Sequence, residues 1–268
     1  SYIVDPETHR GPAHELRRLG LAPDTEAAVR KAFPQGTGML VVDQVQAGSP
    51  AFGHLQVGDV LVKVDERQVT QFEPLEALLD EAIGRNVVLE LQRGGKTVRE
   101  TLVVGDLDAI TPAAFVEFGE AIVHDLSYQQ ARHFNLPVRG VYVANPGYVL
   151  AAAGVPRAAL ITAVNGRAVG RLADFRAVLD TLGDGDRATL RYTTMDDPNG
   201  SVLKAFRMDR RWYPARQCRR DDVAGLWPCE ALPAGPAPKP NIPGSTTFPR
   251  HPDPLIASLA PSLVHLRF

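Results

Sequence analysis

Between residues 41 and 104, hydrophobic positions follow first the period of a strand, then that of a helix, then that of strands again. Val60, Val62 and Val64 stand two residues apart, a period that favours a strand with one buried face. The expected elements are a strand at 41–45, a turn at 48–51, a strand at 60–64, a helix at 72–82, and strands at 87–91 and 98–104 joined by a turn at 93–96. The pattern therefore predicts a small domain built of strands and a helix.

The same order returns one hundred residues further along the chain. Residues 160–166 repeat the pattern of residues 60–66, and Val169, Phe175 and Leu179 stand where Val69, Leu75 and Leu79 stand. Self-similarity at a fixed offset indicates repeated structural units. At this repeat length we expect two copies of one domain rather than a solenoid.

The order of strand, Gly-Ser-Pro-Ala turn, Gly-Asp strand, helix and hairpin resembles a PDZ domain of the form used by HtrA/Deg proteases. Three longer stretches are more specific, and they read ELRRLGL at 15–21, GDLDAITP at 105–112 and HDLSYQQAR at 124–132. They resemble the large HtrA-like proteases of the yeast nuclear type and their plant Deg relatives. Those proteins carry an active protease domain, PDZ domains and a degenerate second protease half.

The resemblance implies an α+β fold with two PDZ-like domains, each a half-open β-barrel with a groove helix. We expect the first domain, with N-terminal helices, at 1–108 and the second at 109–214. Residues 215–268 are expected to be a linker and the start of a truncated following domain. Residues 233–254 are rich in proline, which favours an extended linker, and residues 255–268 are apolar and strand-like.

Charge and hydropathy limit the partners of the chain. Its net charge is −2 at pH 7, which excludes a general polyanion binder. Residues 207–220 are basic and contain Trp212 and Tyr213, a combination also found at nucleic-acid contacts. We favour a final strand with a solvated surface segment, and expect no nucleic-acid partner. No apolar run is long enough to span a membrane, so we expect no membrane partner.

The cysteines and histidines of the sequence form no recognisable metal-binding or disulfide motif. Cys218 and Cys229 lie at no metal-ligand spacing, and we interpret them as two unpaired structural thiols. No pair of histidines stands at metal-binding spacing. We therefore expect no metal and no cofactor.

The sequence holds no recognisable catalytic serine. It has neither the Gly-Asn-Ser-Gly-Gly type of loop used by HtrA proteases nor a Gly-x-Ser-x-Gly elbow. His124, Asp125 and Ser127 supply the residue types of a triad, but triad members converge from separate elements. We predict no catalysis in this chain, which starts without Met and is expected to be part of a longer protein that resembles an HtrA/Deg serine endopeptidase.

The resemblance implies peptide binding, in which an extended peptide adds a strand beside the groove helix. In the second domain we expect a carboxylate-binding loop at 117–120 and a binding strand at 121–123. The site residues expected there are Phe118, Gly119, Glu120, Ala121, Ile122 and Val123, with Leu172, Phe175, Val178 and Leu179 from the helix. Phe118 and Ile122 are expected to form pocket walls, whereas the helix residues could line either the core or the pocket. The acidic Glu117 and Glu120 suggest weak C-terminal binding or a preference for internal or basic segments.

In the first domain, Tyr2, Ile3 and Val4 are candidates for the binding strand, with a frayed terminus as the alternative. The helix candidates are Leu75, Leu78 and Leu79. Most of these apolar residues are expected to belong to the core.

Three hypotheses remain for the function. The leading one is a non-catalytic tandem PDZ module of an HtrA-like serine endoprotease in protein quality control. Its expected partners are peptides or unfolded-protein segments, the protease domains of the same parent chain, and further copies in a homo-oligomer. The second is a structural spacer or assembly module whose grooves are occluded, and the third is an enzyme in its own right. Family members occur in nuclei and chloroplasts, and the sequence does not decide the compartment.

Overall fold

The computed structural model describes residues 10–11, 13–36, 38–237 and 252–259. The described residues up to 237 form one compact unit, and residues 252–259 belong to a second unit. No helix in the described part of the chain combines the length and apolar content needed to cross a bilayer.

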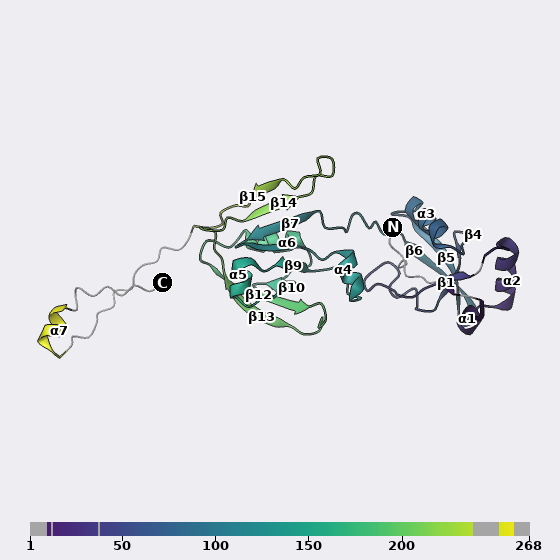
Figure 1. The fold of residues 1–268 in the computed structure, drawn as a ribbon, viewed down its shortest axis with the longest axis horizontal. Helices are drawn as coiled ribbons and strands as arrows, with labels where there is room; N and C mark the ends of the chain where they lie inside the picture. The colour runs from purple at the N-terminus through teal and green to yellow at the C-terminus, as the bar shows by residue number, and fades with distance from the viewer. Residues whose placement is uncertain (1–9, 12, 37, 238–251, 260–268) are drawn as a thin grey trace. The chain divides into compact units, whose positions relative to one another are not determined.

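The first PDZ-like part is a sheet with three helices (Figure 1). Its elements are β1 (Arg10–Gly11), α1 (Ala13–Arg18), α2 (Pro23–Ala32), β2 (Met39–Val41), β3 (Val60–Val64), β4 (Arg67–Gln68), α3 (Phe72–Glu81), β5 (Asn86–Arg93) and β6 (Lys96–Val103). The antiparallel sheet runs β1-β2-β3-β5-β6, and β4 pairs with β3. The helix and the strands expected between 60 and 104 are present in the expected order, whereas the strand expected at 41–45 lies at 39–41.

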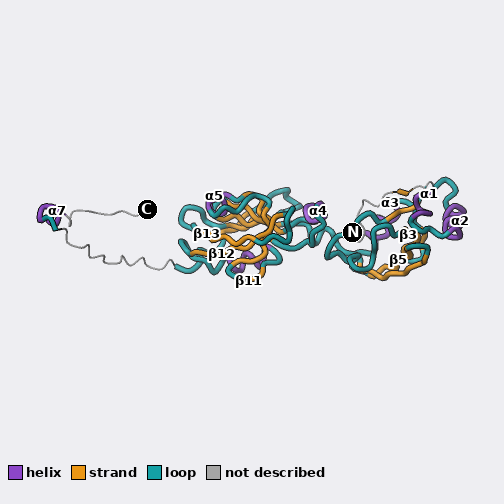
Figure 2. The backbone as a smooth tube through the Cα atoms, turned by 90° about the horizontal axis from the view of Figure 1, so that it is seen from below, coloured by secondary structure: helices purple, strands orange, loops and turns teal. Residues whose placement is uncertain are grey.

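The second part repeats this arrangement and extends it. Its elements are β7 (Ala114–Phe118), β8 (Ala121–Asp125), α4 (Tyr128–His133), β9 (Val141–Asn145), α5 (Gly147–Ala152), β10 (Ala159–Val164), β11 (Arg167–Ala168), α6 (Leu172–Leu179), β12 (Arg187–Thr194), β13 (Val202–Arg207), β14 (Arg216–Arg219) and β15 (Cys229–Ala231). The sheet runs β13-β12-β10-β9-β8-β7-β14-β15, with β11 on β10. Its strands gather in the interior, with α4 and α5 at the periphery (Figure 2). The sheet does not close into a barrel in either part of the chain that the structure describes.

Local details recur at the same offset of one hundred residues. Asp65 and Glu66 both have positive φ, 47° and 65°, and so do Asn165 and Gly166, at 48° and 75°. Two consecutive positive φ angles are typical of the type I′ hairpin turn, which the Asn-Gly pair predicted. The pairing of β3 with β5 shifts between residues 61 and 63, and that of β10 with β12 shifts between residues 161 and 163. The repeat therefore extends to the irregularities of the sheet.

Strands β2 and β3 of the first sheet are buried on both faces. Leu40 and Leu61 belong to the cluster around α3, whereas their neighbours Val41, Val60 and Val62 belong to a second cluster with α1 and α2. Adjacent side chains in a strand point to opposite faces. Alternate side chains at 60–62 therefore enter two apolar clusters, and Val64, which follows the register shift, joins the cluster around α3.

Two sequence expectations need correction in the C-terminal part. The cysteines are not unpaired thiols, because Cys218 and Cys229 form a disulfide between β14 and β15. The two residues stand opposite each other in the hairpin register, which their spacing of 11 in sequence did not reveal. The described part of the apolar tail is helical rather than strand-like, because Pro254 begins α7 (Pro254–Leu259) and the Asp253 carboxylate accepts the Leu255 N–H at 2.8 Å.

The boundary expected at residue 214 falls inside one sheet. β14 pairs with β7, and β15 pairs with β14. Residues 216–231 thus continue the sheet of the second domain, because the chain returns to its edge after β13. Backbone pairing over such a sequence separation has no local sequence signal.

Candidate functional site

The binding strand expected in the second domain lies in β8. Ala121 and Val123 are fully buried, and Ile122 between them is half-buried. On one side β8 pairs with β9, where His124 lies opposite Tyr142. On the other side, where a bound peptide would add a strand, β8 pairs with β7.

β7 lies antiparallel to β8 in a continuous register. Phe118 is opposite Ala121, and Val116 is opposite Val123. Both Phe118 and Val116 are fully buried. The Phe118 ring lies 5.5 Å from that of Phe175 and 6.2 Å from that of Phe206, measured between ring centroids. Phe118, which we expected to form a pocket wall, is instead a core side chain on the strand that fills the position next to β8.

The loop expected to bind a carboxylate is the tight turn between these two strands. Gly119 and Glu120 have positive φ, 51° and 62°. A Cβ atom on Gly119 would lie 2.1 Å from a methyl carbon of Val149, so only glycine fits. The Gly119 carbonyl accepts the N–H groups of Tyr148 and Val149 at 3.0 and 3.1 Å. The turn is therefore fixed against α5.

Helix α6 covers β7 and β8 and contributes its apolar side to the core. Leu172, Phe175, Val178 and Leu179 are all at most 5% exposed. The helix begins where the Asp125 carboxylate accepts the Leu172 N–H. Of the two roles left open for these four residues, the structure places them in the core.

The C-terminal end of α6 is held by Arg210, a residue that no sequence motif marks as functional. Its guanidinium donates to the carbonyls of Leu179, Leu182 and Pro233 at 2.7–2.8 Å. Burial lowers the pKa of Arg210, while Asp180 and Asp184 nearby act in the opposite direction. A buried cation at a helix C-terminus satisfies carbonyls that otherwise lack partners, and Arg210 thereby fixes the helix that covers β7.

The corresponding helix of the first domain is less covered. In α3, Leu75 and Leu79 are buried at 1% and 5% exposure. Phe72 and Leu78 are only half-buried at the edge of the same cluster. The helix therefore keeps apolar surface in contact with solvent.

The terminal strand of the first sheet is only partly described, because residues 1–9 and 12 lie outside the described residues. β1 pairs with β2, with Gly11 opposite Met39. In the second domain β8 pairs in the same way with β9, with Asp125 opposite Val141, so β1 corresponds to β8. In the described part of the first sheet β1 is the terminal strand. The candidates Tyr2, Ile3 and Val4 lie outside the described residues.

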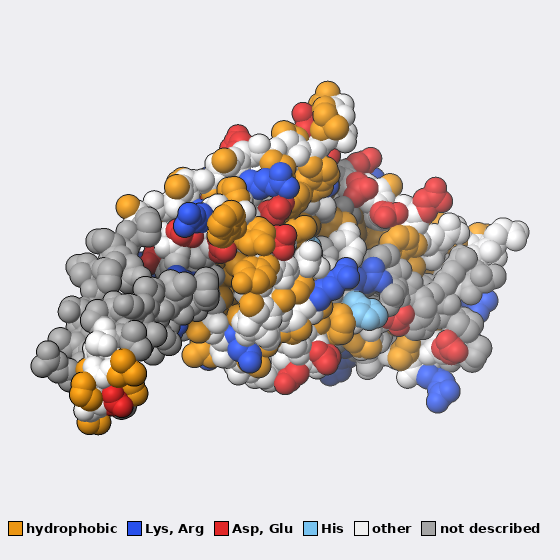
Figure 3. Space-filling model, turned by 60° about the vertical axis from the view of Figure 1, so that its left-hand side comes forward, with side chains coloured by type: hydrophobic (Ala, Val, Ile, Leu, Met, Phe, Trp, Pro, Cys, Tyr) orange, Lys and Arg blue, Asp and Glu red, His pale blue; other side chains and the backbone are white. Residues whose placement is uncertain are grey.

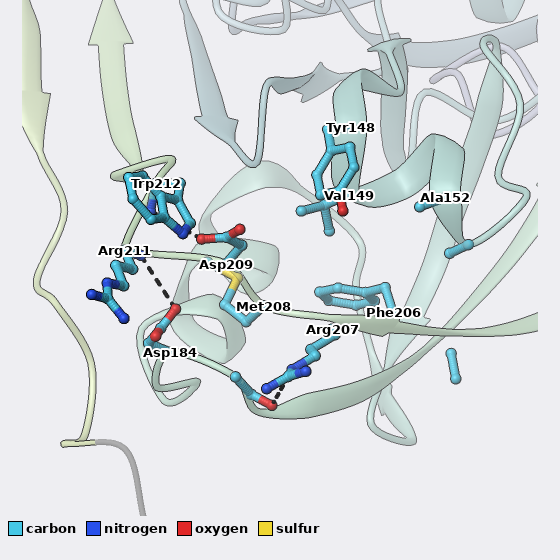
Figure 4. A pocket seen from close by; sticks show the side chains of 13 residues that line it. Tyr148, Val149, Ala152, Asp184, Phe206, Arg207, Met208, Asp209, Arg211 and Trp212 are labelled. Carbon is cyan, nitrogen blue, oxygen red and sulfur yellow. Dashed lines mark hydrogen bonds between the residues drawn. The ribbon is translucent and has the colours of Figure 1, made fainter. Parts of the chain in front are cut away.

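A separate hollow of about 500 Å³ lies between α5 and the end of β13. Figure 4 shows Trp212 and Phe206 on opposite sides of it, with Tyr148 above and Asp184 below. The Asp184 carboxylate accepts backbone N–H groups of Arg210 and Arg211. Among the described residues none of β7, β8 or α6 lines it, so it is distinct from the groove. On the face drawn in Figure 3, side chains of both charge signs are interspersed.

The residues that suggested a triad have other partners. The Asp125 carboxylate binds the Leu172 N–H, and the Ser127 hydroxyl accepts the Gln130 N–H to begin α4. The His124 Nδ1 lies 2.7 Å from the Asp125 carbonyl oxygen. Each of the three therefore supports the fold locally. The described residues include no group of three or more His, Cys, Asp or Glu arranged to hold a metal ion.

Comparison with known proteins agrees with this architecture. A family model described as a PDZ domain matches residues 18–104, and one described as a PDZ-like domain matches residues 109–185. The chain is 43% identical over 244 residues to Protease Do-like 7 of Arabidopsis thaliana, covering 90% of this chain and 22% of that protein. It is 40% identical over 239 residues to the Pro-apoptotic serine protease NMA111 of Ajellomyces capsulatus, covering 88% of this chain and 23% of that protein. The chain thus spans less than a quarter of the length of these relatives.

Proposed function

Because this chain is a tandem PDZ region of the HtrA/Deg protease type, we propose that it is a non-catalytic module that captures extended peptides by strand addition. PDZ domains of such proteases are peptide-binding modules. The captured segments are substrate or regulatory peptides of an HtrA-like serine endoprotease, presented to its protease domains.

The observation that carries this proposal is the uncovered apolar surface of α3. Phe72 and Leu78 stay half-buried at the edge of the cluster around α3, and β1 is the terminal strand of the described part of the first sheet. A peptide added to that edge gains main-chain hydrogen bonds from the sheet and side-chain contacts from the helix. Burying the exposed parts of two apolar side chains adds a favourable hydrophobic contribution. The first domain is therefore our candidate for the peptide receptor.

A second candidate function, a spacer or assembly unit, is favoured for the second domain by a different observation. There, β7 already pairs with β8, and α6 covers both strands. A domain whose binding strand is already paired in this way would act as a spacer or assembly surface and would not bind a peptide. The two roles are compatible within one chain.

The proposal is tested with the whole chain and a library of fluorescently labelled extended peptides. Saturable binding that falls about tenfold or more in Leu78→Glu is expected, since a charge placed against an apolar ligand side chain costs roughly 1.4 kcal/mol or more. Leu203→Glu, at a side chain 57% exposed on β13, is the matched control and should leave affinity unchanged. A generic protease assay run alongside should show no turnover. Binding by no peptide, or equal binding by both variants, would contradict the proposal.

A further inference from the structure

β7 has the geometry that a peptide ligand adopts in strand addition. It runs antiparallel to β8 and pairs with it from Phe115 opposite His124 to Phe118 opposite Ala121. Its alternate side chains Val116 and Phe118 are directed into the core under α6, where both are fully buried. The segment thus makes the two kinds of contact, main-chain and alternate side-chain, by which a groove holds a peptide.

The effect of β7 is visible when matched positions of the two domains are compared. Leu172 and Val178 of α6 are 4% and 5% exposed. Phe72 and Leu78, one hundred residues earlier on α3, are half-buried. The apolar side chains of α3 and α6 have the same spacing along the helix. The difference in their exposure therefore comes from the segments that cover them. In the second domain that cover includes β7.

The far edge of β7 is also occupied. β14 pairs with it over four residues, from Arg216 opposite Glu117 to Arg219 opposite Ala114. The Arg216 guanidinium donates to the Glu117 carboxylate at 2.7 and 2.9 Å. Beyond it, β15 is tied to β14 by the disulfide. No edge of β8 or β7 therefore remains free for another strand.

We propose that β7 is an internal ligand that keeps the peptide groove of the second domain closed, so that only the first domain of the folded chain receives peptides. The inference builds on strand addition as the mode of binding in the proposed function. It gives residues 114–118 the role of a ligand, in addition to their place in the sheet. The side chains of Val116 and Phe118 hold the segment in the groove.

The test compares the whole chain with its Val116→Ser/Phe118→Ser variant, using a hexapeptide of sequence Ala-Ala-Phe-Val-Glu-Phe copied from residues 113–118. Calorimetric titration should show that the variant binds one more hexapeptide per chain than the wild type. A scrambled hexapeptide should show no such difference. The matched control is Val202→Ser/Leu203→Ser, which changes two exposed side chains of β13 and should leave the stoichiometry at the wild-type value.

Equal stoichiometry in a folded Val116→Ser/Phe118→Ser variant would overturn the inference. If that variant does not fold in its second domain, added hexapeptide should restore the circular dichroism spectrum and the scrambled peptide should not. Failure of that rescue would overturn it as well. A wild-type chain that binds no hexapeptide would contradict the proposed function of the first domain. Equal binding by the wild type and the variant would contradict the role of β7, so the two failures are distinguishable.

Discussion

Phe118 of β7 packs against Phe175 of α6 with ring centroids 5.5 Å apart and ring planes at 49°. Both side chains are at most 1% exposed. The pair joins the strand that fills the second groove to the helix that covers it. In the first domain the residue equivalent to Phe175 is Leu75.

Removing one ring of this pair should strongly destabilise the second domain. Phe175→Ala leaves a cavity that the surrounding strands cannot fill, and we expect a loss of about 3–5 kcal/mol in the free energy of unfolding. Urea denaturation followed by circular dichroism measures it. Phe52→Ala is the control, since that side chain is 59% exposed and its removal should cost less than about 0.5 kcal/mol. Similar losses in both variants would show that the aromatic pair does not support the groove.

The turn between β7 and β8 should not accept a side chain. Gly119→Ala combines a positive φ with a Cβ atom 2.1 Å from Val149, so we expect it to destabilise the domain by more than about 2 kcal/mol. Gly53→Ala shares the positive φ, at 87°, but has nothing within 4 Å of the new atom. Its cost should stay near 1 kcal/mol, on the order of the backbone effect alone. Thermal unfolding of the two variants separates clash from backbone strain, and equal shifts would contradict this account of the turn.

Arg210 should be needed for the end of α6. Arg210→Ala removes three hydrogen bonds to carbonyls and leaves those groups without their charged partner. We expect a loss of roughly 3 kcal/mol, since hydrogen bonds to charged groups contribute about 1.5–3 kcal/mol each and do not add fully. Arg187→Ala, at an exposed position of β12, serves as the comparison. A stability of Arg210→Ala within 0.5 kcal/mol of the wild type, on the order of an ordinary surface change, would rule out this role.

Reduction of the disulfide should loosen the β14–β15 hairpin. Cys218 and Cys229 close a short loop of 11 residues, for which the chain-entropy model gives a stabilisation of about 2–3 kcal/mol. We expect the Cys218→Ser/Cys229→Ser variant to lose that amount in urea denaturation without reductant. Added dithiothreitol should lower the wild type to the same value. A thiol assay that finds two reactive thiols in the unreduced, denatured protein would show that the bond is not formed.

The stability of the first domain should depend on pH through Glu26. Hydrogen bonding from Arg17 holds the pKa of Glu26 below its ordinary value, burial acts in the opposite direction, and a bond from Arg30 again lowers it. A depressed pKa contributes stability above the pKa of the unfolded chain, and that stability is lost as pH falls through the folded value. Glu26→Gln should therefore lower the melting temperature at pH 7 and have a smaller effect below about pH 4, near the unfolded glutamate pKa. The reverse trend would show that burial prevails over the two arginines.

Much of the architecture could be predicted because its signals are local. The strand pattern of residues 60–64 and its repeat at 160–164, the Asn165-Gly166 turn and the helical spacing around Phe175 depend on neighbouring residues, and each was confirmed in the structure. The pairing of Cys218 with Cys229 was missed because it depends on the register of a hairpin. Arg210 gave no signal, since its three carbonyl partners come from two segments distant in sequence.

By itself, the sequence determined that this protein has two related domains of strands and a helix, because periodicity and turn chemistry act over a few residues. It also determined which side chains are apolar at the two groove helices. Only the tertiary structure decided that those apolar positions are covered in one domain and half-exposed in the other. The physical reason is that coverage depends on which strand occupies the edge of β8, and a strand pairs through backbone groups that every residue carries.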